Sequence, residues 1–139
     1  MSSRRQARRT AVDVLYQADL TREDPSEVLQ EWREADRDIP PFTAELVEGV
    51  GDHMPGIDLL LEEHVEGWTL ARMAALDRTI LRVAVEELVH RSDVPVSVAI
   101  NEAVEAANEL STEDSGRFVN GILGRIARER AEAAERPAP

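Results

Sequence analysis

Apolar side chains recur along this chain at steps of three and four residues, the spacing that places them on one face of an α-helix. Seven such stripes occur, near residues 7–18, 28–32, 46–50, 60–65, 80–89, 99–107 and 118–126. No segment of four to eight residues alternates between apolar and polar side chains as a strand would. The pattern therefore predicts an all-α protein of about seven helices.

Proline and glycine residues separate these helices and indicate how they are grouped. Pro40 and Pro41 end a polar linker, and Pro55 with Gly56 marks a break between two stripes. A joint follows near residues 67–75, with Trp68 as its predicted anchor. We expect two packed halves of three to four helices that share a core, followed by a disordered tail. The predicted ranges are 1–68 for the N-terminal half, 69–130 for the C-terminal half and 131–139 for the tail.

The first predicted helix begins with a cluster of arginines. Ser3 can cap this helix, and Arg4, Arg5, Arg8 and Arg9 fill its first two turns. Cations at the positive end of a helix dipole are unfavourable and promote fraying. Two interpretations remain open: a solvated, exposed arm, or an arm that binds the phosphates of RNA.

The charge distribution changes what the overall composition suggests. The net charge of −12 argues against a nucleic-acid partner, yet residues 1–22 hold five Arg and only two acidic residues. Residues 23–71 hold two Arg and fourteen acidic residues. Because charges are screened beyond about 10 Å at ordinary salt, the cationic start can attract phosphates whatever the total charge.

Several classes of protein are disfavoured by what the sequence lacks. There is no cysteine, no run of 18 apolar residues and no secretory signal, so we expect a cytoplasmic protein without disulfides or a membrane span. No hydrolase, metalloprotease, phosphate-loop or calcium-loop motif is present. His53, His64 and His90 have no ligand-like spacing among themselves and are predicted to be ordinary surface or hydrogen-bonded residues. We therefore predict no enzyme activity, no catalytic residue, no metal and no cofactor.

Residues 91–123 carry the most specific pattern in the chain. They predict a loop, a helix that starts after Pro95, a short loop and a second helix that Asp114 or Ser115 can cap. Phe118 lies one turn after Asp114 and next to Arg117. Phe118 is either part of the core or a half-exposed platform on which an unstacked RNA base lies.

If Phe118 is a platform, the neighbouring arginines have a defined role. Arg117 beside it, and Arg82 from the preceding long helix, would hold the adjacent phosphates. Gly121, in the middle of the same apolar stripe, is predicted to allow another helix to approach closely.

Four strings in the chain are typical of one protein family. They are AVDVLYQ after the arginine-rich start, DRTILRVAVEEL, RSDVPVSVAINEAVEAA and STEDSGRFVNGIL, in that order. With them the sequence resembles the NusB family of bacterial transcription antitermination factors over roughly Arg4 to Ile126. The segment from Glu23 to Asp38 and the residues after Ile126 match only loosely.

The resemblance implies partners and contact residues. Members of the family bind the single-stranded boxA element of nascent RNA together with NusE, a ribosomal small-subunit protein. The complex then joins RNA polymerase and promotes transcription of ribosomal RNA operons. Some members form homodimers, and a homodimer remains possible here. By resemblance, RNA contact is expected at Arg4, Arg5, Arg8, Arg9, Asp114, Arg117, Phe118 and Asn120, with Asp77, Arg78 and Arg82 flanking that surface.

Two alternatives compete with this interpretation. NusB-like helical modules also occur at the start of ribosomal RNA cytosine methyltransferases, which require a downstream α/β domain that these 139 residues do not contain. The second alternative is a helical adaptor whose arginine cluster binds only an acidic protein.

Overall fold

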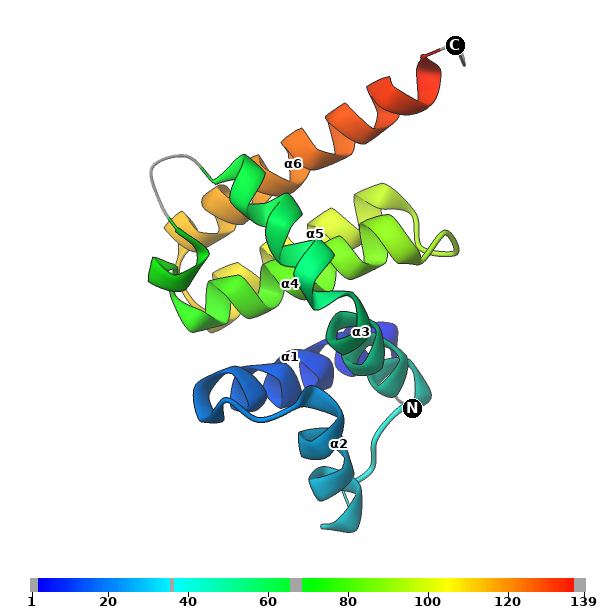
Figure 1. The fold of residues 1–139 in the computed structure, drawn as a ribbon, viewed down its shortest axis with the longest axis vertical. Coiled ribbons are helices and arrows are strands. Elements are labelled where there is room, and N and C mark those ends of the chain that lie inside the picture. The colour runs from blue at the N-terminus through cyan, green and yellow to red at the C-terminus, as the bar shows by residue number, and fades with distance from the viewer. Residues whose placement is uncertain (1–2, 36, 66–68, 137–139) are drawn as a thin grey trace.

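The computed structural model describes residues 3–35, 37–65 and 69–136, which form six α-helices and one short 3-10 helix without any strand. The helices, shown in Figure 1, are α1 (Arg4–Thr21), α2 (Pro25–Glu34), α3 (Pro41–His64), η1 (Leu70–Arg72), α4 (Ala75–His90), α5 (Val96–Leu110) and α6 (Glu113–Glu135). The prediction of an all-α protein is confirmed, with six α-helices in these ranges rather than about seven. No described helix has both the length and the apolarity that a membrane crossing requires.

The difference in number comes from α3, which continues through Pro55. The predicted break at Pro55 and Gly56 was wrong. Proline lacks an N–H and removes one backbone hydrogen bond from a helix. Val50 before it and Ile57 after it are both buried in the core, so tertiary packing anchors the helix on either side of the proline.

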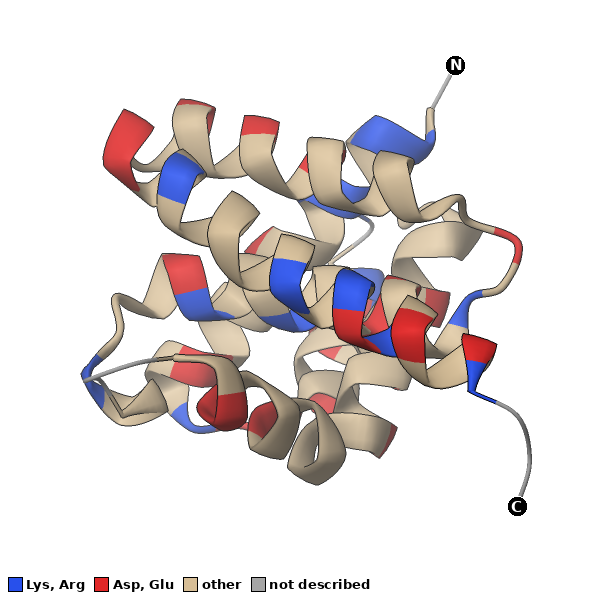
Figure 2. Cartoon of the chain, turned by 90° about the horizontal axis from the view of Figure 1, so that it is seen from above, with Lys and Arg blue, Asp and Glu red and all other residues tan. Residues whose placement is uncertain are grey.

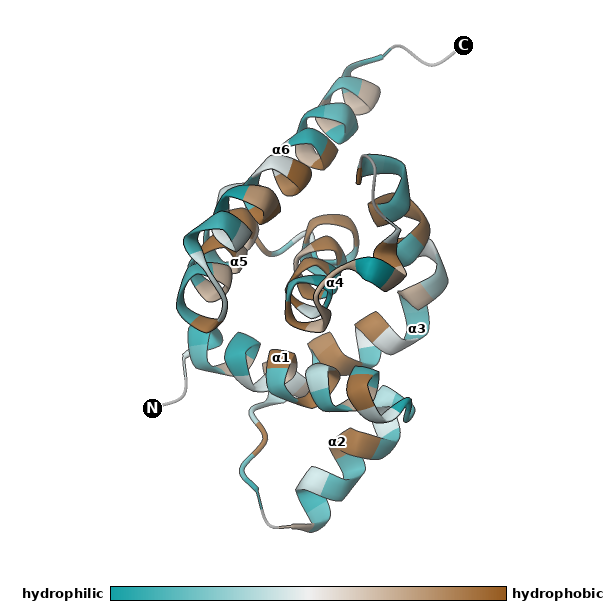
Figure 3. Cartoon of the chain, turned by 90° about the vertical axis from the view of Figure 1, so that its left-hand side faces the viewer, coloured by the Kyte–Doolittle hydropathy of each residue, from teal (hydrophilic) through white to brown (hydrophobic). Residues whose placement is uncertain are grey.

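The central helix is α4, which packs against α1, α3, α5 and α6. Figure 3 looks approximately along α4 and shows the other four around it, with α2 on the outer side of α1. Several successive residues of α4 are buried, including Ile80, Leu81, Val83, Ala84 and Val85. A helix with apolar residues on more than one face requires neighbours on each of those faces. The described helices on both sides of the predicted joint therefore contribute to one hydrophobic core around α4.

The last helix, α6, has a buried part and a projecting part. Its apolar residues up to Ile126 lie in the core, and the residues beyond project from the bundle (Figure 1). Residues 131–135, within the predicted tail, still belong to this helix. Residues 137–139 and Trp68, the predicted anchor of the joint, lie outside the described residues.

Candidate nucleic-acid interface

The arginine-rich start of α1 is stabilised by a capping box. The Ser3 hydroxyl accepts a hydrogen bond from the Gln6 backbone N–H at 3.2 Å, and the Gln6 side chain accepts one from the Ser3 N–H at 3.3 Å. This reciprocal pair satisfies two of the N–H groups that a helix start leaves free. The helix therefore begins in an ordered turn in spite of its four arginines.

Two of these arginines point toward an acidic face of α5. Arg5 Nε donates to Glu102 Oε2 at 3.1 Å, and Arg5 also pairs with Glu105. One turn later, Arg9 Nη1 pairs with Glu109 Oε2 at 2.8 Å. Because the partners advance along α5 as the arginines advance along α1, the two helices lie side by side and run in the same direction.

Arg4 extends this arrangement toward the loop before α5. Its Nη2 pairs with Asp93 Oδ2 at 3.0 Å, and its guanidinium lies 4.3 Å from the centre of the Phe42 ring, within cation–π range. Arg4, Arg5 and Arg9 together are called the arginine row below. A groove beside the row is lined by Arg5, Gln6, Arg9, Thr10, Asp13, Asp38, Pro40 and Glu109.

Arg8 points the other way, into the core. Its side chain is 9% exposed and pairs at 2.7 Å with Glu87, which is 2% exposed. Burial raises the pKa of Glu87, and the Arg8 guanidinium opposes that shift. Arg8 is therefore a structural residue that joins α1 to α4, and its burial argues against the RNA contact expected for it.

The start of α6 is held on α4 by Asp77. Thr112 caps α6 by accepting a hydrogen bond from the Ser115 N–H at 3.0 Å, so the cap is Thr112 and not Asp114 or Ser115. The Ser115 hydroxyl donates in turn to Asp77 Oδ2 at 3.1 Å. Asp77 is buried, and through this hydrogen bond it positions the start of α6 against α4.

Beyond this anchor, four of the predicted contact residues face solvent. Phe118 is 37% exposed, Arg117 and Asp114 form an exposed pair, and Asn120 is exposed. Asp114 lies in the first turn, where a carboxylate is favoured by the helix dipole. We call Asp114, Arg117, Phe118 and Asn120 the α6 cluster.

The arginine row and the α6 cluster are joined through the end of α5. Arg9 reaches Glu109, and α6 begins at Glu113 after a short connection. α5 packs extensively on α6, whereas the ion pairs of the arginine row reach α5 and its preceding loop. The arginine row thus borders the acidic face of α5, and the α6 cluster follows the connection at the end of α5.

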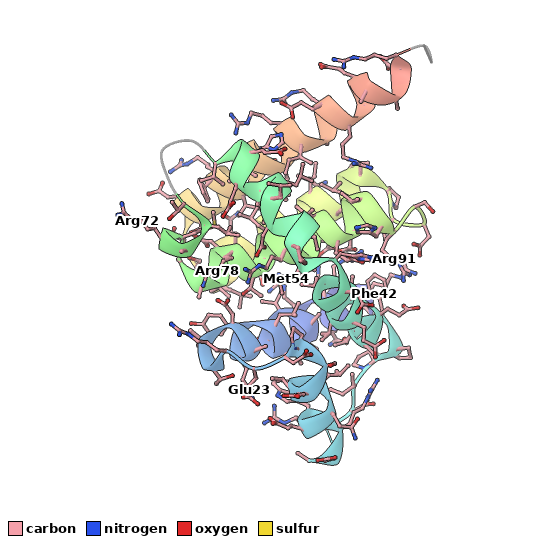
Figure 4. All side chains as sticks on the ribbon, viewed as in Figure 1. Glu23, Phe42, Met54, Arg72, Arg78 and Arg91 are labelled. Atoms are coloured by element: carbon pink, nitrogen blue, oxygen red, sulfur yellow. The ribbon has the colours of Figure 1, made fainter. Side chains whose placement is uncertain are left out.

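Arg78 and Arg82 belong to a different place. Both pair with Asp19 near the end of α1, and Arg82 also pairs with Asp58 of α3 at 2.8 Å. Their side chains are only 14% and 13% exposed. In Figure 4, Arg78 at the start of α4 and Arg91 at its end lie on opposite sides of the molecule. Arg78 and Arg82 tie α4 to α1 and α3, away from the arginine row.

One feature of this surface was missed from the sequence, the acidic face of α5. Glu102, Glu105 and Glu109 lie on one face of α5, and their spacing of three and four residues could have indicated it. Figure 2 shows the result, with basic and acidic positions interspersed over the helices. The prediction for Gly121 was wrong, because no atom lies within 4 Å of where its Cβ would be.

The fold and these exposed strips of charged and aromatic side chains define a helical binding protein. The family model described as NusB family matches residues 5–128. This chain belongs to the NusB family.

Relatives in sequence support this assignment over nearly the whole chain. It is 56% identical over 131 residues to transcription antitermination protein NusB of Saccharopolyspora erythraea, covering 91% of this chain and 88% of the relative. A protein of the same name from Acidothermus cellulolyticus is 43% identical, covering 100% of this chain and 97% of the relative. Both relatives are named as antitermination proteins and not as enzymes.

Solved structures of NusB proteins also match the fold of this chain. NusB of T. maritima matches with a TM-score of 0.83 at 36% identity, covering 92% of each chain. A crystal structure of the antitermination factors NusB and NusE in complex with double-stranded RNA matches with a TM-score of 0.81 at 29% identity, covering 91% of this chain and 96% of that one.

Proposed function

We propose that this chain is a transcription antitermination factor that binds the single-stranded boxA element of RNA together with NusE. It joins the RNA polymerase antitermination complex in the cytoplasm, promotes transcription of ribosomal RNA operons, and acts by binding and not by catalysis. The observation that carries the proposal is family membership over residues 5–128, together with the structural match to a NusB–NusE–RNA complex.

We propose that RNA lies along the strip from the arginine row to the α6 cluster. Arg5 and Arg9 are exposed or half-exposed and stand beside an open groove on α1. Guanidinium groups bind phosphates through paired N–H donors, so these side chains are suited to the RNA backbone. Arg117 can hold a phosphate at the other end of the strip, because its ion-pair partner, Asp114, is itself exposed to solvent.

Phe118 can contact an RNA base, whereas the arginines are suited to the phosphates. A ring that is 37% exposed on the surface of a rigid helix can stack on an unpaired base. The rest of its helix face, Val119, Ile122 and Leu123, is buried and holds the backbone in place. Stacking on Phe118 therefore requires no rearrangement of the helix.

We propose that the α5 carboxylates form ion pairs with Arg5 and Arg9 when no RNA is bound. Arg5 and Arg9 already have partners in Glu102, Glu105 and Glu109. A phosphate must share or displace those carboxylates, so RNA affinity without NusE should be weak.

The test is filter binding to boxA RNA and to a scrambled RNA, with and without NusE. The proposal predicts sequence-selective binding that NusE enhances. Binding to NusE with no preference for boxA would instead support the protein-binding adaptor. The arginine row predicts a salt slope of about −0.7 per phosphate contact, or roughly −2 for three contacts in log–log terms.

Arg5→Ala with Arg9→Ala should flatten that salt slope by about 1.4. Arg130→Ala is the matched control, because Arg130 is exposed on the projecting part of α6, about 18 Å along the helix from Phe118. An unchanged slope in the double variant would remove the arginine row from the RNA site.

Phe118→Ala should weaken boxA binding by about 1–3 kcal/mol, the usual contribution of one base stacked on an aromatic ring. Leu59→Ala is the control, since Leu59 is a large apolar residue exposed on α3. If Phe118→Ala instead lowers the free energy of unfolding by about 3–5 kcal/mol while the RNA affinity of the folded molecule is intact, Phe118 is a core residue.

A further inference from the structure

Three side chains with metal-binding chemistry converge between α3 and α4. They are His53 from α3 and Glu86 and His90 from α4, and one possible ligand atom from each lies within 4.8 Å of the others. Glu86 and His90 are one helical turn apart, so both project from the same face of α4. None of the three belongs to the arginine row or the α6 cluster.

Glu86 is a buried carboxylate whose negative charge is only partly compensated by its neighbours. It is 3% exposed, and His53 Nδ1 lies 2.9 and 3.2 Å from its two oxygens. No other hydrogen-bond partner of this carboxylate is found within residues 3–35, 37–65 and 69–136. Burying an ionised carboxylate is costly unless a cation or several donors compensate it. A half-exposed imidazole provides only part of that compensation.

Gly49 makes room for this carboxylate. A Cβ at position 49 would collide with Glu86 Oε1 and Cδ. Glycine is disfavoured in the middle of a helix, and here its absent side chain is what lets Glu86 lie against α3. The local structure thus accommodates a carboxylate at this point of the α3–α4 contact.

The two histidines are arranged so that ligand atoms are available from solvent. Their rings are stacked with centroids 3.6 Å apart and an angle of 14° between the planes. His90 is exposed and His53 is half-buried, which leaves an open path for an ion.

We propose that His53, Glu86 and His90 form a binding site for a divalent transition-metal ion, with Zn²⁺ the best match. Two imidazoles and one carboxylate are a common Zn²⁺ ligand set, with the fourth position left to water. Ligand atoms of a tetrahedral Zn²⁺ site lie about 3.3 Å apart, so the rings must turn out of their stack toward Glu86. The bound ion bridges α3 to α4 and neutralises the buried carboxylate.

Proton NMR of the untagged, chelator-treated chain tests this directly, because the sequence contains only three histidines. On titration with Zn²⁺, the ring signals of His53 and His90 should shift to a saturable end point at one equivalent. His64 is the internal reference, since it bonds to the Leu60 carbonyl and to Glu129 away from the cluster. Zn²⁺ should also raise Tm, because it binds only the folded arrangement.

His90→Gln is the main variant, because His90 is exposed and its loss leaves the core intact. It should abolish saturable binding and the rise in Tm without changing boxA affinity, and Glu86→Gln should do the same if it folds. His64→Gln is the matched control and should keep both effects. The proposal is overturned if all three histidines respond alike at millimolar Zn²⁺, or if His90→Gln binds Zn²⁺ as the natural chain does.

Discussion

Four arginines in six residues have two different roles, and the difference arises at the scale of single side chains. Arg5 and Arg9 extend over the acidic face of α5, while Arg8 between them is buried against Glu87. Neighbouring residues on a helix point about 100° apart, so Arg8 and Arg9 meet different surroundings. The cluster therefore combines arginines that pair with α5 at the surface and one arginine that forms a buried ion pair with α4.

Arg8→Met should lower the free energy of unfolding by about 3–5 kcal/mol, because it leaves the Glu87 carboxylate buried without its partner. Urea unfolding followed by circular dichroism measures this. Arg5→Ala is the control and should change stability little, since the Arg5 side chain is 52% exposed. Equal effects of the two substitutions would show that the Arg8–Glu87 pair is not a structural anchor.

Glu87 also predicts a pH dependence. Because burial raises its pKa above the ordinary value of 4.5, the folded state holds the Glu87 proton more tightly than the unfolded state does. Its stabilising contribution is complete below the unfolded pKa and is lost as pH rises through the folded pKa. The stability of the natural chain minus that of Glu87→Gln should thus decrease from pH about 4 to about 7. An increase over the same range would mean that Arg8 outweighs burial.

At the scale of helices, two mid-helix glycines, Gly49 of α3 and Gly121 of α6, have different surroundings. Gly49 faces the buried Glu86 carboxylate, whereas nothing lies within 4 Å of a Cβ at Gly121. Glycine lowers helix stability wherever no contact requires it. Gly49 is thus explained by packing, and the structure offers no packing reason for Gly121.

Gly121→Ala should raise the free energy of unfolding by up to about 1 kcal/mol through helix propensity alone. Gly49→Ala should lower it by about 1–3 kcal/mol, because the Glu86 side chain must move in a packed region. Thermal and urea unfolding of the two variants give the comparison. Stabilisation by both substitutions would show that Glu86 can relocate freely.

At the scale of the whole molecule, acidic side chains balance the charge of the arginine row. The arginine row is partnered by Asp93 and by the α5 carboxylates, so its charge is largely balanced in the free protein. The hydrogen bond from Arg9 holds the pKa of Glu109 below its usual range, because it stabilises the ionised carboxylate. Under the proposed function, the α5 carboxylates compete with RNA phosphates for these arginines.

Glu105→Gln with Glu109→Gln should therefore strengthen RNA binding by roughly two- to tenfold at low salt, with less effect at high salt. The matched control is Glu132→Gln with Glu135→Gln, which makes the same change in net charge on the exposed end of α6. Dissociation constants measured at several salt concentrations decide the point. Equal gains from both pairs would assign the effect to net charge and not to competition on α5.

Much of this protein could be predicted from local patterns. The helices at residues 4–21, 75–90, 96–110 and 113–126, the all-α class and the family strings follow from residue spacing and caps, which depend on the backbone geometry of one helix at a time. The exposed position of Phe118 was one of two interpretations left open, and its 37% exposure supports the platform.

The remaining features depend on which helices come to lie against each other. Arg8 lies on the same helix face as Ala11 and Leu15, but its ion pair with Glu87, and that of Arg9 with Glu109, depend on where α4 and α5 pack. Core packing on both sides of Pro55 outweighs the local cost of proline and keeps α3 whole. His53 lies far along the chain from Glu86 and His90, and they meet because α3 crosses α4. Such contacts arise from long-range packing, which the spacing of residues within one helix does not encode.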